Sequence, residues 1–242
     1  MKGNSFLKFA IPMSGLMLVI LIIMSSVSPI ACTTTQIQLA PYSIEDFGPY
    51  IAAQTVMVRA GTSSGSGTLI NKQYVLTAYH VVQGSSEALI DLPGASGIRC
   101  SVETFGNLES VDYAILKIED EIPEGIELNI AQVDLEEEFL VGRQIFFAGF
   151  PQGGDFHLTE GLLSSISDTF YKTSAPVMFG QSGGGVYDNH GHLIGVISRM
   201  GQMNNGFFSI PIYHDSYYVP IQSIFKDLSM KNKTYVFQGF EK

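Results

Sequence analysis

Short apolar runs separated by turn residues make up most of this chain of 242 residues. Glycine is abundant, with 25 residues, and few stretches repeat apolar residues at the 3.6-residue spacing of a helix. This pattern predicts an all-β barrel or sandwich rather than alternating strands and helices. The expected strands are residues 55–60, 65–70, 87–91, 98–104, 112–118, 144–149, 161–166, 185–188, 193–199 and 206–210.

Two local patterns near the C-terminus add to this arrangement. Residues 189–192, Asn-His-Gly-His, have the composition of a hairpin turn between the strands on either side. Residues 220–228 carry Ile221, Ile224 and Leu228 on one face, which predicts a C-terminal amphipathic helix. Residues 231–242 follow as a short polar tail.

The N-terminal segment has the pattern of a leader. Lys2 and Lys8 precede an uncharged stretch from residue 9 to residue 31, which indicates a signal peptide or an uncleaved membrane anchor over residues 1–31. Cys32 follows in a context that partly resembles a bacterial lipoprotein signal, which makes Cys32 a possible lipidation site. Pro29 departs from that signal, because leucine is usual at its position. We expect an extracytoplasmic protein, either membrane-tethered by anchor or lipid or secreted, with residues 32–47 as a linker.

Composition and charge narrow the function. With 45% apolar residues the chain can bury one sizeable core or two smaller adjoining ones. Removal of residues 1–31 leaves 11 basic and 23 acidic residues, a net charge of −12, which argues against nucleic-acid binding. No metal or cofactor signature is evident, because His190 and His192 stand on a turn and are expected to face solvent. Cys100 is expected to be a small apolar residue rather than a reactive thiol.

Three polar residues have contexts that suit nucleophilic catalysis. Ser182 lies within the glycine-rich heptapeptide 179–185, where a tight turn can expose a hydroxyl and leave backbone N–H groups free. His80 follows an apolar strand, and Asp112 opens another. Each alone has an ordinary structural explanation, but the three together predict a Ser-His-Asp triad.

Several short segments match the motifs of one known family. The chain resembles the trypsin-fold serine peptidases, nearest to the HtrA (Deg)-like branch, over roughly residues 51–229. The matching segments are T-A-Y-H-V-V at 77–82, V-D-Y-A-I-L-K-I at 111–118, G-Q-S-G-G-G at 180–185, G-S-G-T-L-I at 65–70, L-I-G-V-I at 193–197 and G-F-F-S-I-P-I at 206–212.

The resemblance implies an all-β fold of two six-stranded antiparallel barrels with the site in the cleft between them and a short C-terminal helix. The peptidase domain would cover residues 48–230, with the barrel boundary near residues 134–140 and the acidic stretch 134–138 at the crossover. Only about 14 residues follow the predicted helix, so we expect no PDZ domain, unlike most members of that branch. The implied activity is a serine endopeptidase acting on extracytoplasmic proteins or peptides without a cofactor. The oligomeric state stays open.

The resemblance also assigns roles to individual residues. Ser182 would be the nucleophile, His80 the general base and then acid, and Asp112 the orienting carboxylate. The N–H groups of Gly180 and Ser182 would form the oxyanion hole. Ser198 matches a serine that supports the aspartate, and residues 197–200 should offer an edge strand to the substrate, so the substrate-binding candidates are Pro176, Ile197, Ser198, Arg199 and Met200.

Departures from the family pattern bear on specificity and leave a second hypothesis open. Gln181 replaces an aspartate, so activation by N-terminal trimming is not expected. Pro176 at the pocket floor carries no acid, which favours an apolar substrate residue before the scissile bond. Met200 would narrow the pocket. Arg199 could instead favour acidic substrate side chains. Gly185 in place of a proline, with Tyr79 beside the histidine, fits the alternative of a catalytically inactive binding module at the membrane surface.

Overall fold

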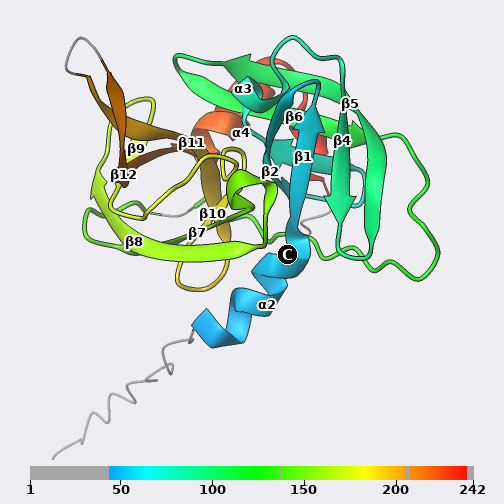
Figure 1. Cartoon of the computed structure of the whole chain (residues 1–242), viewed down its shortest axis with the longest axis horizontal. Coiled ribbons are helices and arrows are strands. Elements are labelled where there is room, and N and C mark those ends of the chain that lie inside the picture. The colour runs from blue at the N-terminus through cyan, green and yellow to red at the C-terminus, as the bar shows by residue number, and fades with distance from the viewer. Residues whose placement is uncertain (1–43, 137, 205–207, 239–242) are drawn as a thin grey trace, which may run out of the picture. The chain divides into compact units, whose positions relative to one another are not determined.

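The computed structural model describes residues 44–136, 138–204 and 208–238 (Figure 1). The strands are β1 Thr55–Ala60, β2 Ser63–Leu69, β3 Tyr74–Thr77, β4 Glu87–Leu92, β5 Ala95–Asn107, β6 Val111–Ile118, β7 Gln144–Gly149, β8 His157–Ser165, β9 Tyr171–Thr173, β10 Gly185–Tyr187, β11 Leu193–Asn204 and β12 Ser209–Pro220. The helices are α2 Ile44–Gln54, α3 Tyr79–Val82 and α4 Ile221–Met230, with short 3₁₀ turns η1 Pro151–Gly153 and η2 Thr234–Phe237.

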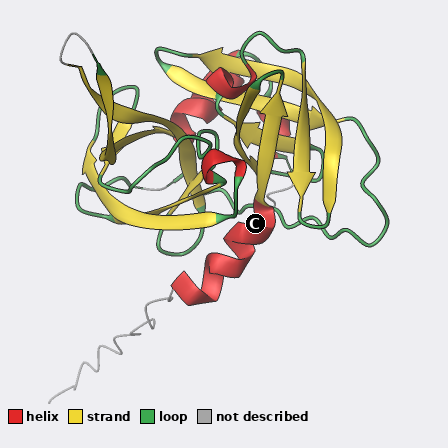
Figure 2. Ribbon diagram, in the orientation of Figure 1, coloured by secondary structure: helices red, strands yellow, loops and turns green. Residues whose placement is uncertain are grey.

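The strands form two closed antiparallel barrels that lie side by side (Figure 2). The first has the order β1-β2-β3-β6-β5-β4 and the second β10-β11-β12-β9-β8-β7. The chain crosses once from β6 to β7, through the segment that contains Asp134, and α4 follows the last strand of the second barrel. The prediction of two six-stranded barrels with a short C-terminal helix is confirmed.

Burial explains why the central strands form where they do. All four residues of β3 are buried, and β6 is buried continuously from Asp112 to Leu116, as expected for strands covered on both faces. Strand β4 instead alternates buried and exposed positions, because its outer face meets solvent. The buried strands β3 and β6 pair with each other, and this pairing positions the histidine motif, which follows β3, next to the aspartate motif in β6.

The main hydrophobic core runs through both barrels. One cluster of buried side chains includes Val56 and Leu76 of the first barrel together with Phe146, Tyr187 and Val196 of the second. A smaller cluster fills the interior of the second barrel alone. The two barrels consequently share buried surface rather than meeting through a thin solvated contact.

The structure differs from the sequence expectations in several elements. The list of expected strands lacked β3 and β9, and β11 and β12 are longer than expected. Helix α2 was not expected, and its first residues, 44–47, fall within the stretch read as a linker; Phe47 and Ile51 pack into the core. The hairpin turn between β10 and β11 is present as predicted.

The leader lies outside the described residues, as do Cys32 and residues 206–207 of the last expected strand. None of the helices in the described ranges is both long enough and apolar enough to cross a bilayer.

Candidate active site

The His80–Asp112 pair is built by two neighbouring strands. Strand β3 pairs with β6, with Thr77 opposite Ala114, and the chain turns directly from β3 into α3, which carries His80. The Asp112 carboxylate accepts two hydrogen bonds from this residue. One comes to Oδ2 from ring Nδ1 at 2.7 Å and the other to Oδ1 from the backbone N–H at 3.1 Å. The ring orientation is thereby fixed, and Nε2 is the ring nitrogen that Asp112 does not use.

Asp112 has a further partner from the second barrel. Ser198, on β11, donates its hydroxyl to Asp112 Oδ2 at 2.6 Å, and both residues are almost completely buried. Burial opposes ionisation of the carboxyl group, but the hydrogen bonds from His80 and Ser198 outweigh it, so the pKa of Asp112 lies below its ordinary value. The carboxylate is therefore charged at neutral pH and joins the two barrels at the site.

Ser182 is connected to the Asp112 pair through Ser198, and its hydroxyl has the Ser198 carbonyl as its acceptor. Its hydroxyl donates a long hydrogen bond of 3.5 Å to the Ser198 carbonyl, and no hydrogen bond within the described residues joins it to His80. Its backbone is held next to α3. A Cβ added to Gly65 would lie 2.6 Å from Val81 Cγ2 on one side and 2.7 Å from the Ser182 carbonyl oxygen on the other. Only glycine at this position lets the two segments come so close.

The predicted oxyanion hole includes a backbone position that requires glycine. Gly180 has φ of +94°, and a Cβ there would lie 2.5 Å from the Gln152 nitrogen, so only glycine fits. Within the described residues no hydrogen bond uses the N–H of Gly180 or that of Ser182. An oxyanion hole needs backbone donors that are not already used in this way.

Ser66 supports this turn and was missed by the sequence analysis, which treated it only as part of a strand. Its hydroxyl donates to the Gly180 carbonyl at 2.8 Å and accepts the Phe150 N–H at 2.9 Å. Its own N–H donates to the Ser182 carbonyl at 2.7 Å. The first barrel therefore holds both ends of the oxyanion turn through one buried residue. A serine between two glycines, Gly65 and Gly67, was the only sequence signal for it.

Residues that depart from the family pattern have local packing roles. Gln181 is buried and accepts the Met178 N–H through Oε1 at 2.7 Å, so it stabilises the turn before the nucleophile. At Gly185 a Cβ would lie 2.6 Å from the Tyr187 ring, which leaves no room for a proline. Tyr79 stacks on Phe105 with a centroid separation of 4.3 Å. Tyr79 thus packs against β5, and neither Gly185 nor Tyr79 removes a catalytic group.

The substrate-binding candidates do not all occupy the same surface. Arg199 and Met200 line a cavity of about 730 Å³ beside β11. Pro176 is not among its lining residues, and its carbonyl accepts the Thr159 hydroxyl. The assignment of Ile197 as a substrate-binding residue is corrected, because its side chain is fully buried. Its backbone is already bonded to the nucleophile turn: its carbonyl accepts the Gly183 N–H at 2.7 Å, and its N–H donates to the Gly184 carbonyl at 2.9 Å. The free edge of β11 therefore begins at Ser198.

A separate polar cluster lies at the β10–β11 hairpin. Asp134, Asp188 and His192 have potential ligand atoms within 4.8 Å of one another. Asp188 Oδ1, however, accepts the N–H groups of His190 and His192 at 2.8 Å each, and Oδ2 lies 3.7 Å from the Arg143 guanidinium. The buried carboxylate closes the turn and faces a cation, so the cluster is explained as an ion pair that fastens the hairpin.

Comparisons with known proteins identify the family of the chain. Residues 65–196 match the model of the trypsin-like peptidase domain. A probable periplasmic serine endoprotease DegP-like from Pseudomonas fluorescens is 28% identical over 185 residues, which covers 73% of this chain and 36% of that protein. The chloroplastic protease Do-like 1 of Arabidopsis thaliana is 31% identical and is covered over 37% of its length. The chain thus spans about a third of the length of these relatives.

Solved structures show the same fold. A serine endoprotease from Yersinia pestis superposes with a TM-score of 0.64 at 20% identity, covering 82% of this chain and 68% of that one. The HtrA-type protease AlgW with tripeptide superposes with a TM-score of 0.62 at 19% identity, covering 81% and 64%. With more than half of its length matched by one family model, the chain belongs to the family of trypsin-like peptidase domains.

Proposed function

We propose that this protein is a serine endopeptidase that cleaves extracytoplasmic proteins or peptides through an acyl-enzyme intermediate. The observation that carries the proposal is the Asp112 carboxylate. It holds His80 Nδ1 at 2.7 Å and accepts Ser198, whose carbonyl in turn lies 3.5 Å from the Ser182 hydroxyl. The periplasmic endoproteases among the relatives agree with this activity.

The arrangement supports the following steps. The Ser182 hydroxyl rotates from the Ser198 carbonyl toward His80 Nε2, loses its proton to that nitrogen and attacks the scissile carbonyl carbon. The N–H groups of Gly180 and Ser182 stabilise the oxyanion, and Asp112 stabilises the imidazolium. His80 then gives its proton to the leaving amine, leaving the acyl group on Ser182. Water, deprotonated by His80, hydrolyses this ester and restores the hydroxyl.

Labelling by a fluorophosphonate probe tests the nucleophile directly. We expect the folded wild-type protein to be labelled and the Ser182→Ala variant not to be, with turnover reduced on the order of 10⁴-fold or more by loss of any triad side chain. Folding of each variant is checked by circular dichroism. A folded wild type that is neither labelled nor active would instead support the inactive binding module.

Specificity and location are finer parts of the proposal. Pro176 supplies no acid to a pocket floor, so we propose an apolar residue immediately before the scissile bond. Cleavage of a randomised peptide library tests this, and dominance of Lys or Arg at that position would contradict it.

We also propose a membrane-tethered or secreted protein. Mass analysis of the mature N-terminus in membrane and soluble fractions, with Cys32→Ser as control, distinguishes anchor, lipid and release.

A further inference from the structure

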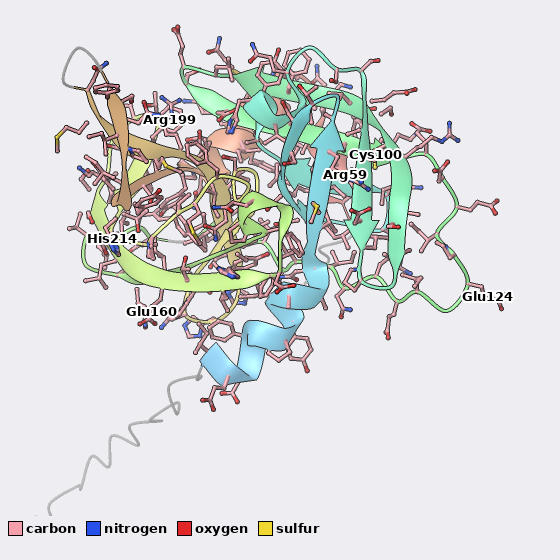
Figure 3. The ribbon with its side chains drawn as sticks, viewed as in Figure 1. Arg59, Cys100, Glu124, Glu160, Arg199 and His214 are labelled. Carbon is pink, nitrogen blue, oxygen red and sulfur yellow. The ribbon has the colours of Figure 1, made fainter. Side chains whose placement is uncertain are left out.

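The cavity beside β11 is lined by residues of β8, β9, β11 and β12 of the second barrel, and Arg199 in its lining directly follows Ser198, which donates to Asp112. Cross-strand neighbours run across its base: Arg199 lies opposite Tyr217, and Tyr217 opposite Lys172. With a volume of about 730 Å³ it can accept substrate side chains. Figure 3 shows Arg199 beside β11 and β12, in the other barrel from Arg59.

Arg199 carries the positive charge of this cavity that no carboxylate offsets. Its guanidinium carbon lies 3.9 Å from the centre of the Phe170 ring, and Nη2 donates to the Leu108 carbonyl at 2.7 Å. None of the ion pairs between described residues includes it, whereas Lys172 pairs with Asp215 at 2.9 Å. A guanidinium has five N–H donors, so one bond to Leu108 leaves the others for a ligand. The group is exposed, charged and already held in position.

The free edge of β11 determines which substrate residue meets Arg199. Strand β10 pairs with β11 only as far as Val196, and the nucleophile turn occupies Ile197, so the unpaired edge begins at Ser198. Ser182 Oγ lies 3.5 Å from the Ser198 carbonyl, which places the residue with the attacked carbonyl (P1) opposite Ser198. A substrate strand running antiparallel then sets the preceding residue (P2) opposite Arg199. Paired residues of an antiparallel ladder project to the same face.

The next position on this face has a different charge. The residue two places before P2 would lie opposite Gly201, where a Cβ would meet the Asp215 carboxylate at 2.6 Å. A second acid there would approach a like charge, although Lys172 partly offsets it. The charge on this face therefore differs between the position opposite Arg199 and the position opposite Gly201.

From these observations we propose that Arg199 forms an acid-binding subsite, and that the protein selects peptide substrates with Asp or Glu at P2. The inference rests on the proposed function, because it uses the register of a substrate at Ser182. Binding forms a charge-assisted hydrogen bond between the substrate carboxylate and the preorganised guanidinium. The low conformational freedom of the stacked arginine reduces the entropic cost of that contact.

Two peptides that differ only by Glu or Gln at P2, each with valine at P1, test the subsite. We expect kcat/KM to favour the Glu peptide about tenfold in the wild-type protein, as for one charge-assisted contact. Arg199→Gln should bring the ratio to about 1, and Arg199→Lys should keep part of the preference. Arg59→Gln, which removes an exposed arginine of the first barrel that pairs with Asp91, is the matched control and should leave the ratio unchanged.

The same peptides also separate this inference from the proposed function. Their binding to the Ser182→Ala variant, followed by fluorescence anisotropy, requires no turnover. Cleavage with a Glu to Gln ratio of about 1, or a ratio that survives in Arg199→Gln, would overturn the subsite alone. Glu-selective binding without any turnover by wild type would support the subsite and overturn the peptidase. If the Arg199–Leu108 contact had only a structural role, Arg199→Gln would lower kcat/KM for both peptides equally. The ratio of the two values would then stay at its wild-type level, and this result would also overturn the subsite.

Discussion

At the scale of single residues, Ser198 gives the clearest test of how the site holds its charge. Ser198→Ala removes one hydrogen bond to the buried Asp112 carboxylate, while the two from His80 remain. We expect kcat to fall about tenfold, because a hydrogen bond to a charged group contributes about 1.5 to 3 kcal/mol, not all of it used in the transition state. Steady-state kinetics across pH would show it. An unchanged kcat would mean that His80 alone orients the carboxylate.

The pH dependence of stability gives a second reading of the same contact. The folded pKa of Asp112 is lowered, so its contribution is fully present above the unfolded value of about 3.9 and is lost as the pH falls through the folded pKa. The unfolding free energy should therefore differ between wild type and Ser198→Ala by about 1.5 to 3 kcal/mol at pH 7, and by less at a pH below the lowered folded pKa of Asp112. Denaturation at both pH values measures this. A larger difference at the lower pH would contradict it.

Ser66 offers a test of the oxyanion turn that leaves the triad untouched. Ser66→Ala leaves the Gly180 carbonyl and the Phe150 N–H without their shared buried partner. We expect kcat to fall about tenfold to a hundredfold with little change in KM. The backbone N–H donors would lose their alignment, and they stabilise charge that develops only in the transition state. Rescue by Ser66→Thr would show that the hydroxyl is required, whereas a loss confined to KM would argue against this positioning role.

The residues of the site divide into those that sequence could predict and those that it could not. His80, Asp112 and Ser182 stand in motifs that were recognisable, and the structure brings His80 and Asp112 into direct contact. The role of Ser66 depends on contacts with residues 84 and 114 positions away, which no local pattern contains. Ile197 was misassigned because its backbone partners come from the nucleophile turn, a pairing that only the fold reveals.

At the scale of elements, α4 is the helix that ties the end of the chain to the first barrel. Tyr113 of β6 donates to Asp227 of α4 at 2.5 Å, and Lys231 pairs with the same carboxylate at 2.6 Å. Tyr113→Phe should lower the unfolding free energy by about 1 to 2 kcal/mol, since it removes a hydrogen bond to a charged group while keeping the ring. Urea denaturation measures it, with exposed Lys226→Ala as a control expected to change it by less than about 0.5 kcal/mol. Equal effects of the two substitutions would contradict this role for Tyr113.

A strand or helix could be predicted from the sequence when neighbouring residues determine it, and could not when distant contacts do. The strand at residues 144–149 was predicted with its observed bounds, because an apolar run sits between turn residues. Strand β9 has three residues and is defined by its pairing with β8 and β12 rather than by any pattern of its own. Helix α2 was missed because its stability comes from Phe47 and Ile51 packing into a core that lies elsewhere in the sequence.

At the scale of the whole molecule, the shared core predicts that the two barrels unfold together. Phe146, Tyr187 and Val196 of the second barrel belong to the same buried cluster as the interior of the first. Opening one barrel would expose apolar surface of the other, at about 25 cal/mol per Å², so a half-unfolded state should be poorly populated. Tryptophan is absent from the chain, so a single introduced tryptophan reports on its own barrel.

Leu89→Trp in β4 and Leu162→Trp in β8 are a matched pair for this measurement, because both leucines are exposed, by 39% and 50%, one in each barrel. In guanidinium chloride each tryptophan should give the same midpoint as far-UV circular dichroism of the same variant. Because exposed substitutions change stability little, the midpoints of the two variants should also nearly agree. Two well-separated midpoints would instead show that each barrel is stable alone, and that the contact from Ser198 to Asp112 joins two independent folding units rather than lying within one.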